Sequence, residues 1–210
     1  MIIDIFQDNV CPWCRIGKAN LFRALEEYSG EPVTIRWRAY MLDPSVPEEG
    51  LPFMSTMRQK YGKQFSKEGM ISRVVEAGAA AGVKFDFDKV DMMPNTKLSH
   101  RLIAIAPDST KTDLVEAINR AYFEEGRDIG SRSVLLEIAE ENGLASAELG
   151  ERLDRGEGER QVEEDFAMAR KIGISGVPFF IVGGKFGLSG AQPPESFLKV
   201  FRRLEEQADK

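Results

Sequence analysis

Residues 1–14 are MIIDIFQDNVCPWC, and this stretch indicates how the chain begins to fold. Residues 2–6 are mostly apolar, which is typical of a short strand buried on both faces. We predict a helix from about Pro12, because proline is well tolerated in the first helical turn. Cys11 and Cys14, the only two cysteines of the chain, therefore lie where a strand passes into a helix. A pair this closely spaced cannot form a structural disulfide framework, so its role must be local.

Further strands are predicted near both ends of the chain. Residues 33–40 alternate apolar and polar side chains, as in a half-buried strand. Two strands joined by one helix form a parallel crossover unit. The strand pattern returns only at residues 178–182, where Gly183-Gly184 favours a tight hairpin to residues 185–188. A last amphipathic helix carries apolar residues at 197, 200, 201 and 204.

The middle of the chain has a helical pattern. Residues 43–50 are rich in turn-forming residues and indicate a linker. Five apolar helix faces follow, which end at Gly82, Pro107, Gly126, Gly143 and Gly173. We therefore predict an α/β domain built from residues 1–43 and 174–210. An all-helical domain, residues 44–173, is inserted into it and is expected to cover the edge that carries the cysteines.

Composition excludes some classes of function. The chain has 210 residues and a net charge of -6, which argues against nucleic-acid binding. Its apolar stretches are shorter than the roughly 18 residues that a membrane span requires. The N-terminus lacks the basic, apolar and small-residue zones of a signal peptide, so we expect a cytoplasmic protein. Two cysteines and one histidine are too few for a structural zinc site, and no metal site is predicted.

The position of the cysteines favours redox chemistry. Free N–H groups and the positive dipole end of a helix stabilise a thiolate. Cys11 is therefore predicted to be an exposed nucleophile with a lowered pKa. Cys14, one turn later, is predicted to be more buried and to resolve the mixed disulfide. Arg15 and Lys18 could add positive charge, but solvated helix residues are the favoured interpretation.

The chain resembles the DsbA-like thioredoxin superfamily, in which a thioredoxin fold carries a helical insertion, and within it the FrnE-like proteins. The similarity rests on Asp8 to Cys14, Asn95-Thr96 with Ser99 to Leu102, Glu125 to Ile129, Gly176 to Phe180, and Gly187 with Ser189 to Pro194. Gly176-Val177-Pro178 resembles the cis-proline loop of that superfamily, which faces the CxxC pair and presents backbone groups to a substrate. The resemblance thus implies a thiol–disulfide oxidoreductase without a bound cofactor.

The resemblance also implies partners and a rival activity. Expected partners are a protein or small-molecule disulfide, glutathione or a thioredoxin-type protein as reductant, and a second copy in a homodimer. Related 2-hydroxychromene-2-carboxylate isomerases and kappa-class glutathione transferases usually carry serine at the position of Cys11. Two cysteines favour redox chemistry here, with a glutathione-dependent isomerase or transferase of a small aromatic or polyketide-like molecule as the alternative. A peptide-binding holdase with incidental cysteines is a further alternative.

Other residues give weaker signals. Pro12, Trp13, Val177, Pro178 and His100 are the candidate substrate-binding residues. His100 is either a proton shuttle or substrate contact near the thiols, or a hydrogen-bonded residue that holds the helical domain to the rest, which we favour. Trp13 is as easily a merely exposed aromatic residue. Met54, Met57 and Met70 either line an adaptable apolar groove or, as we favour, fill the core.

Overall fold

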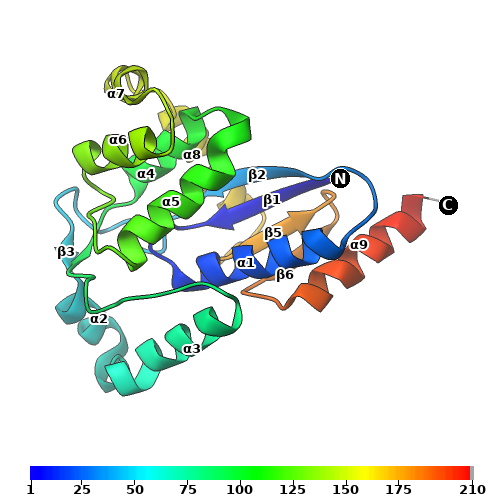
Figure 1. Cartoon of the computed structure of the whole chain (residues 1–210), viewed down its shortest axis with the longest axis horizontal. Helices are drawn as coiled ribbons and strands as arrows, with labels where there is room; N and C mark the ends of the chain where they lie inside the picture. Colours follow the sequence, from blue (N-terminus) through cyan, green and yellow to red (C-terminus); the bar gives the residue numbers. More distant parts are fainter. Residues whose placement is uncertain (209–210) are drawn as a thin grey trace.

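The computed structural model of the chain describes residues 1–208, and a mixed four-stranded sheet lies at its centre (Figure 1). The strand order is β2-β1-β5-β6. β1 (Ile2–Gln7) runs parallel to β2 (Thr34–Ala39), with α1 (Pro12–Glu27) between them. β5 (Phe179–Val182) is antiparallel to β1 and to β6 (Phe186–Ser189). The predicted crossover unit and the predicted hairpin are both confirmed.

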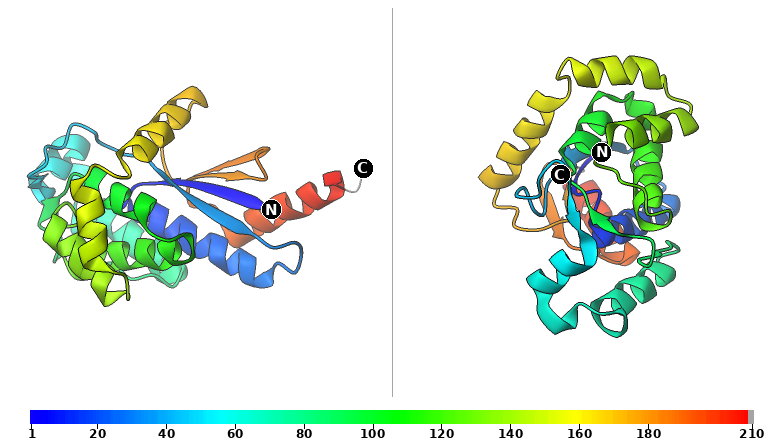
Figure 2. Two further views of the ribbon diagram at one scale, coloured as in Figure 1. Left: turned by 90° about the horizontal axis from the view of Figure 1, so that it is seen from above. Right: turned by 90° about the vertical axis from the view of Figure 1, so that its left-hand side faces the viewer.

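Strand residues alternate between two covered faces of the sheet. Ile3 and Ile5 pack with Phe180 against α1 and α9 (Pro194–Ala208) on one face. Phe6 packs on the opposite face against Ala169 of α8 (Glu159–Lys171). Figure 2 shows the sheet between α1 and α9 on one side and α8 on the other. Because both faces are covered, β1 is buried from Ile3 to Gln7, and its two polar residues, Asp4 and Gln7, are buried as well.

The residues between β2 and β5 are mainly helical and gather at the end of the sheet where α1 begins (Figure 1). This position agrees with the expectation that the insertion covers the cysteine-bearing edge. The remaining helices are α2 (Phe53–Tyr61), α3 (Ser72–Ala80), α4 (Lys97–Ile105), α5 (Lys111–Phe123), α6 (Arg132–Glu141) and α7 (Ser146–Asp154), with shorter turns at Gly62–Gln64, Lys67–Ile71 and Asp108–Thr110.

The helices α2 and α7 and two short strands of the insertion were not among the elements predicted from its sequence. β3 (Leu51–Pro52) and β4 (Met92–Met93) form a small antiparallel pair. Two-residue strands carry too little sequence pattern to be recognised. The boundaries of the two domains, at residues 43/44 and 173/174, stay predictions. Over residues 1–208, no helix is both long and apolar enough to cross a membrane.

Candidate active site

The first turn of α1 positions both cysteines. Cys11 is the N-cap residue and has an extended backbone (φ -92°, ψ 110°), and Pro12 follows at the first helical position. The amide of Cys11 donates to the carbonyl oxygen of Asp8 (3.0 Å), and the amide of Cys14 donates to that of Cys11 (3.1 Å). Cys11 therefore lies at the N-terminus of α1, where the first N–H groups of a helix have no partners within the helix.

Both thiols are buried, and this corrects the prediction that Cys11 is exposed. Cys11 is 3% and Cys14 is 4% exposed, because side chains of the inserted segment cover the start of α1. No disulfide joins the two cysteines in the structure. Burial raises the pKa of Cys14 well above its usual value, and the hydrogen bond to Cys11 and the charge of Cys11 raise it further. Cys14 therefore holds its proton at neutral pH.

The loop before β5 faces the cysteine pair, as the resemblance implied. The Val177–Pro178 peptide bond is cis, and the thiol of Cys11 donates to the carbonyl oxygen of Val177 (3.6 Å between Sγ and O). Gly17 of α1 allows Pro178 of this loop to pack closely against the helix. A Cβ atom at Gly17 would lie 2.9 Å from Cγ of Pro178, closer than real Cβ contacts.

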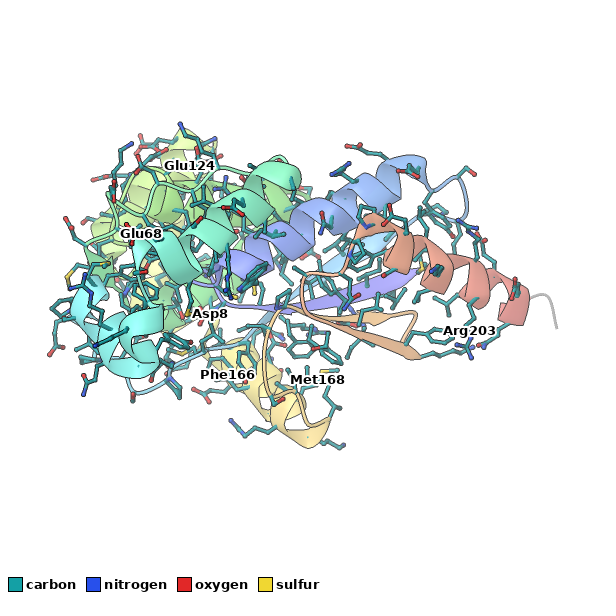
Figure 3. All side chains as sticks on the ribbon, turned by 90° about the horizontal axis from the view of Figure 1, so that it is seen from below. Asp8, Glu68, Glu124, Phe166, Met168 and Arg203 are labelled. Carbon is teal, nitrogen blue, oxygen red and sulfur yellow. The ribbon has the colours of Figure 1, made fainter. Side chains whose placement is uncertain are left out.

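A polar network lies beneath the cysteine turn and consists of Asp8, Asn9, Ser99 and His100, all buried. Nδ2 of Asn9 donates to Oγ of Ser99 (2.7 Å), and Oδ2 of Asp8 accepts from the amide of Leu42 (2.7 Å). Figure 3 shows Asp8 just past the end of β1, at the end of the sheet where the inserted helices gather. The network thus connects the residues before α1 to the start of α4.

His100 joins the insertion to the sheet, as the favoured interpretation predicts. Its Nε2 lies 3.0 Å from the carbonyl oxygen of Tyr40 and 3.5 Å from Oδ1 of Asp8. Since a carbonyl oxygen only accepts, Nε2 carries a hydrogen. Oδ1 of Asp8 is buried and has no hydrogen-bond partner among the described residues, and the His100 ring is close to it. His100 is not among the residues that line the cavity beside Cys11.

A charge cluster of Arg15, Lys18, Glu116 and Glu124 ties α1 to α5, which corrects the favoured interpretation of the two basic residues. Nη2 of Arg15 lies 2.6 Å from both Glu116 Oε1 and Glu124 Oε1, and Lys18 pairs with Glu116. Burial opposes the charge of Glu116, but Lys18 and Arg15 outweigh it and lower its pKa. Figure 3 shows Glu124 among the helices of the insertion. The partners are about a hundred residues apart in sequence, so helix periodicity alone did not reveal them.

An apolar cavity of about 200 Å³ opens beside Cys11. The α1 side contributes Val10 to Trp13, Leu42 and Val177. The inserted segment contributes apolar and aromatic residues from α2 to the residues after α3, namely Phe53, Met57, Tyr61, Phe65, Met70, Ile71, Val74 and Phe87. Met57 and Met70 thus line a groove rather than only fill the core, while Met54 packs against the core.

The structure brings most of the candidate site residues together. Cys11, Pro12, Trp13 and Val177 share the cavity wall, and Pro178 packs against Gly17. Asp8 and the aromatic wall of the cavity were not predicted from the sequence as parts of the site. Asp8 had one signal, its place three residues before Cys11 at the end of a strand, whereas the aromatic residues resemble ordinary core positions. Among residues 1–208, no cluster of three or more His, Cys, Asp or Glu could hold a metal.

Comparison with known families agrees with this geometry. Residues 2–202 match the family model for the DSBA-like thioredoxin domain. The chain belongs to the DsbA-like thioredoxin family. As a family member, it combines the thioredoxin sheet with a helical insertion, and the similarity to FrnE-like proteins is consistent with this assignment.

Individual relatives and solved structures match nearly the whole chain. The uncharacterized protein YwbO of Bacillus subtilis is 28% identical over 204 residues, which are 94% of each chain. The crystal structure of a probable DsbA oxidoreductase from Streptomyces coelicolor is 29% identical, with a TM-score of 0.86 over 97% of this chain and 89% of that one. The cytosolic disulfide reductase DsbM of Pseudomonas aeruginosa with GSH has a TM-score of 0.69 and 19% identity, covering 100% of both chains.

Proposed function

We propose that this protein is a thiol–disulfide oxidoreductase in which Cys11 is the nucleophile and Cys14 the resolving thiol. One observation carries the proposal. Two cysteine side chains lie one helical turn apart at the N-terminus of α1, and the Cys11 thiol lies beside a cavity and the carbonyl group of Val177. Membership of the DsbA-like thioredoxin family supports the same chemistry.

The exchange proceeds in two displacements. The Cys11 thiolate attacks one sulfur of a substrate disulfide, a Cys11–substrate disulfide forms, and the other substrate sulfur leaves as a thiolate. Cys14 then gives up its proton and attacks the sulfur of Cys11. The Cys11–Cys14 disulfide forms and the second substrate thiolate leaves. Two electrons pass from the dithiol to the substrate, and both leaving thiolates take up protons.

The environment of Cys14 suits the second displacement. Burial keeps its proton in place in the resting protein, and part of its raised pKa comes from the charge of Cys11 and the hydrogen bond to Cys11. Once the sulfur of Cys11 is bonded to substrate it carries no charge, so that contribution disappears. The proton of Cys14 therefore becomes easier to remove when the resolving thiolate is needed.

The net direction depends on the partner that restores the dithiol. We propose a cytoplasmic location, where the pair is kept mostly reduced and works as a reductase or isomerase. A thiol reductant, either glutathione or a thioredoxin-type protein, then reduces the Cys11–Cys14 disulfide. This choice of reductant is supported by the similarity to DsbM, whose structure contains GSH.

The proposal is tested by measuring how fast the protein reduces insulin disulfides when a thiol reductant is supplied to regenerate its dithiol. We expect turnover by the wild type, loss of turnover in Cys11→Ser, and accumulation of a mixed disulfide with substrate in Cys14→Ser. Mass spectrometry of the trapped Cys14→Ser adduct locates the bond at Cys11. Absence of turnover by the wild type, or unchanged turnover in Cys11→Ser, would contradict the proposal.

A glutathione-dependent isomerase or transferase is the second candidate. The observation that favours it is the similarity of the fold to a 2-hydroxychromene-2-carboxylate isomerase (TM-score 0.71, 14% identity). Such an enzyme activates one thiol cosubstrate and needs no resolving cysteine. It therefore predicts that Cys14→Ser keeps full activity and that glutathione binds saturably, which calorimetry with reduced glutathione measures.

A further inference from the structure

A basic rim lies at the end of α2 and in the turn that follows it. It consists of Arg58, Lys60 and Lys63, whose side chains are all exposed. From residue 53 to residue 66 the chain has these three basic residues and no acidic one, although its net charge is -6. Positive charge is thus concentrated on one part of an acidic protein, and such a patch attracts groups of opposite charge.

Two of the three rim side chains are available to a new partner. Lys60 pairs with Asp43 (3.5 Å), whereas Arg58 and Lys63 have no ion pair within the described part of the chain. The helix dipole explains only part of this pattern. It favours basic residues in the last turn of α2, but it equally favours acidic residues in the first turn, where there are none. Lys63 lies beyond the helix, where the dipole offers no explanation.

The basic rim adjoins the cavity beside Cys11. Nζ of Lys60 lies 6.0 Å from the centroid of the Tyr61 ring, and Tyr61 lines the cavity. The other two basic residues line an open hollow of about 410 Å³, and Phe65 belongs to the wall of both the hollow and the cavity. The cavity itself has no charged side chain among the residues whose side chains the structure describes. Recognition of charge on this side of Cys11 therefore falls to the rim.

The shape of the hollow favours a polypeptide over a small ligand. Sites for small molecules bury most of the ligand surface, whereas Arg58, Gly62 and Lys63 are exposed and leave the hollow open. An extended chain can place successive carboxylates along such a surface, and a guanidinium group pairs with a carboxylate through two hydrogen bonds. Exposed charges of this kind raise the rate of association more than the affinity.

We propose that the basic rim docks an acidic polypeptide segment next to the disulfide that Cys11 attacks, so that the preferred substrates are proteins with Asp or Glu residues flanking that disulfide. The inference rests on the proposed function and names its substrate class. The rim takes no part in the exchange of electrons. It raises the rate at which acidic substrates reach the thiolate of Cys11.

Matched peptide disulfides measure the docking. Two symmetrical peptide disulfides differ only in the residues on both sides of the cysteine, which are glutamates in one and lysines in the other. At low salt we expect reduced protein to react about tenfold faster with the glutamate peptide. At about 500 mM salt the difference should nearly vanish, because ions screen exposed charges beyond a few ångströms. Equal rates at low salt, a faster lysine peptide, or a preference that salt does not reduce would overturn the inference.

Charge reversal tests whether the rim causes the preference. The double variant Arg58→Glu with Lys63→Glu should react faster with the lysine peptide than with the glutamate peptide. The matched control is Lys199→Glu with Arg202→Glu, which makes the same change on exposed residues of α9, at the other end of the molecule from α2 (Figure 1). The control should keep the preference of the wild type. An unchanged preference in the rim variant, or an equal change in the control, would overturn the inference.

Oxidised glutathione separates a polypeptide from a small acidic disulfide. The rim variant should lose more of its rate with the glutamate peptide than with oxidised glutathione. An equal or larger loss with oxidised glutathione would assign the rim to small acidic disulfides and overturn the inference.

Failure of the proposed function gives a different result. If the wild type reduces no disulfide, insulin included, the proposed function fails, and docking is measured by calorimetry with the glutamate peptide in which serine replaces cysteine. This peptide should bind the wild type and the α9 control but not the rim variant. Absence of binding to the wild type, or equal binding to all three proteins, would overturn the inference about the rim.

Discussion

Two regions that meet at the first turn of α1 are built on opposite principles. The polar network and the charge cluster are buried apart from the partly exposed carboxylates of Glu116 and Glu124. Their described contacts are short and directional, such as Arg15 with Glu116 and Asn9 with Ser99. The cavity consists of apolar side chains, several of them partly exposed. Hydrogen bonds and ion pairs fix geometry, whereas apolar contacts are non-directional and tolerate different occupants. The first region therefore sets where the thiols lie, and the second sets what reaches them.

The charge cluster should dominate stability. We expect Arg15→Met to lower the free energy of unfolding by about 3 kcal/mol, because Glu116 and Glu124 lose a buried partner. The value lies at the low end of the range for broken buried pairs because both carboxylates keep some contact with water. Urea denaturation measures the change. Arg160→Met is the control, since Arg160 is 88% exposed and pairs with Glu164 one turn away, and it should cost less than about 0.5 kcal/mol. Equal losses of unfolding free energy in Arg15→Met and Arg160→Met would refute the expectation that the buried cluster matters more than a surface ion pair.

The packing of α1 on the loop before β5 should make the second-largest contribution to the free energy of unfolding. Gly17→Ala places a Cβ against Pro178, and we expect a loss of about 1–2 kcal/mol after alanine's better helix propensity offsets part of the crowding. Displacement of the loop should also slow insulin reduction about tenfold. Gly176→Ala is the control, because a Cβ at Gly176 meets no atom within 4 Å. Similar activity in the two variants would show that this contact does not position the site.

The buried thiol of Cys14 should make stability fall at alkaline pH. Its pKa is raised by burial, so above the unfolded value of about 8.5 the unfolded chain loses this proton and the folded protein keeps it. The folded state then binds more protons, and stability falls as pH rises, by up to about 1.4 kcal/mol per pH unit. Denaturation at pH 8.5 and 9.5 measures the slope, which should be shallower in Cys14→Ala. Equal slopes of stability against pH in the wild type and in Cys14→Ala would show that Cys14 does not cause the loss of stability.

The cavity wall should affect stability least and selectivity most clearly. Met57→Ala removes a partly buried side chain, and we expect it to cost less than about 1 kcal/mol. It should nevertheless slow the reduction of a peptide disulfide that carries phenylalanine next to cysteine about threefold. The rate for the matching peptide with glutamate at that position should not change, because only the phenylalanine side chain loses apolar contact. A large loss of stability with unchanged selectivity would mean that the wall is part of the core.

Local sequence pattern was sufficient to predict the elements that carry the cysteines and the hairpin near the end of the chain. The apolar run before Cys11, Pro12 at the first helical position and the Gly183-Gly184 turn each predicted an element that the structure contains. The two-residue strands β3 and β4 were missed because they show no periodicity. Burial of Cys11 was missed because its cover comes from α2 and the residues up to Phe87, more than forty residues away.

The sequence by itself determined the place of the cysteine pair at a helix N-terminus and the elements near the two ends of the chain, because each depends on neighbouring residues. Only the tertiary structure decided that Arg15 and Lys18 are buried, that His100 bonds to Tyr40, and that an apolar cavity adjoins Cys11. The reason is physical. Burying a charge or covering a thiol depends on partners such as Glu116 and Met57, and no local pattern specifies which distant residues will meet.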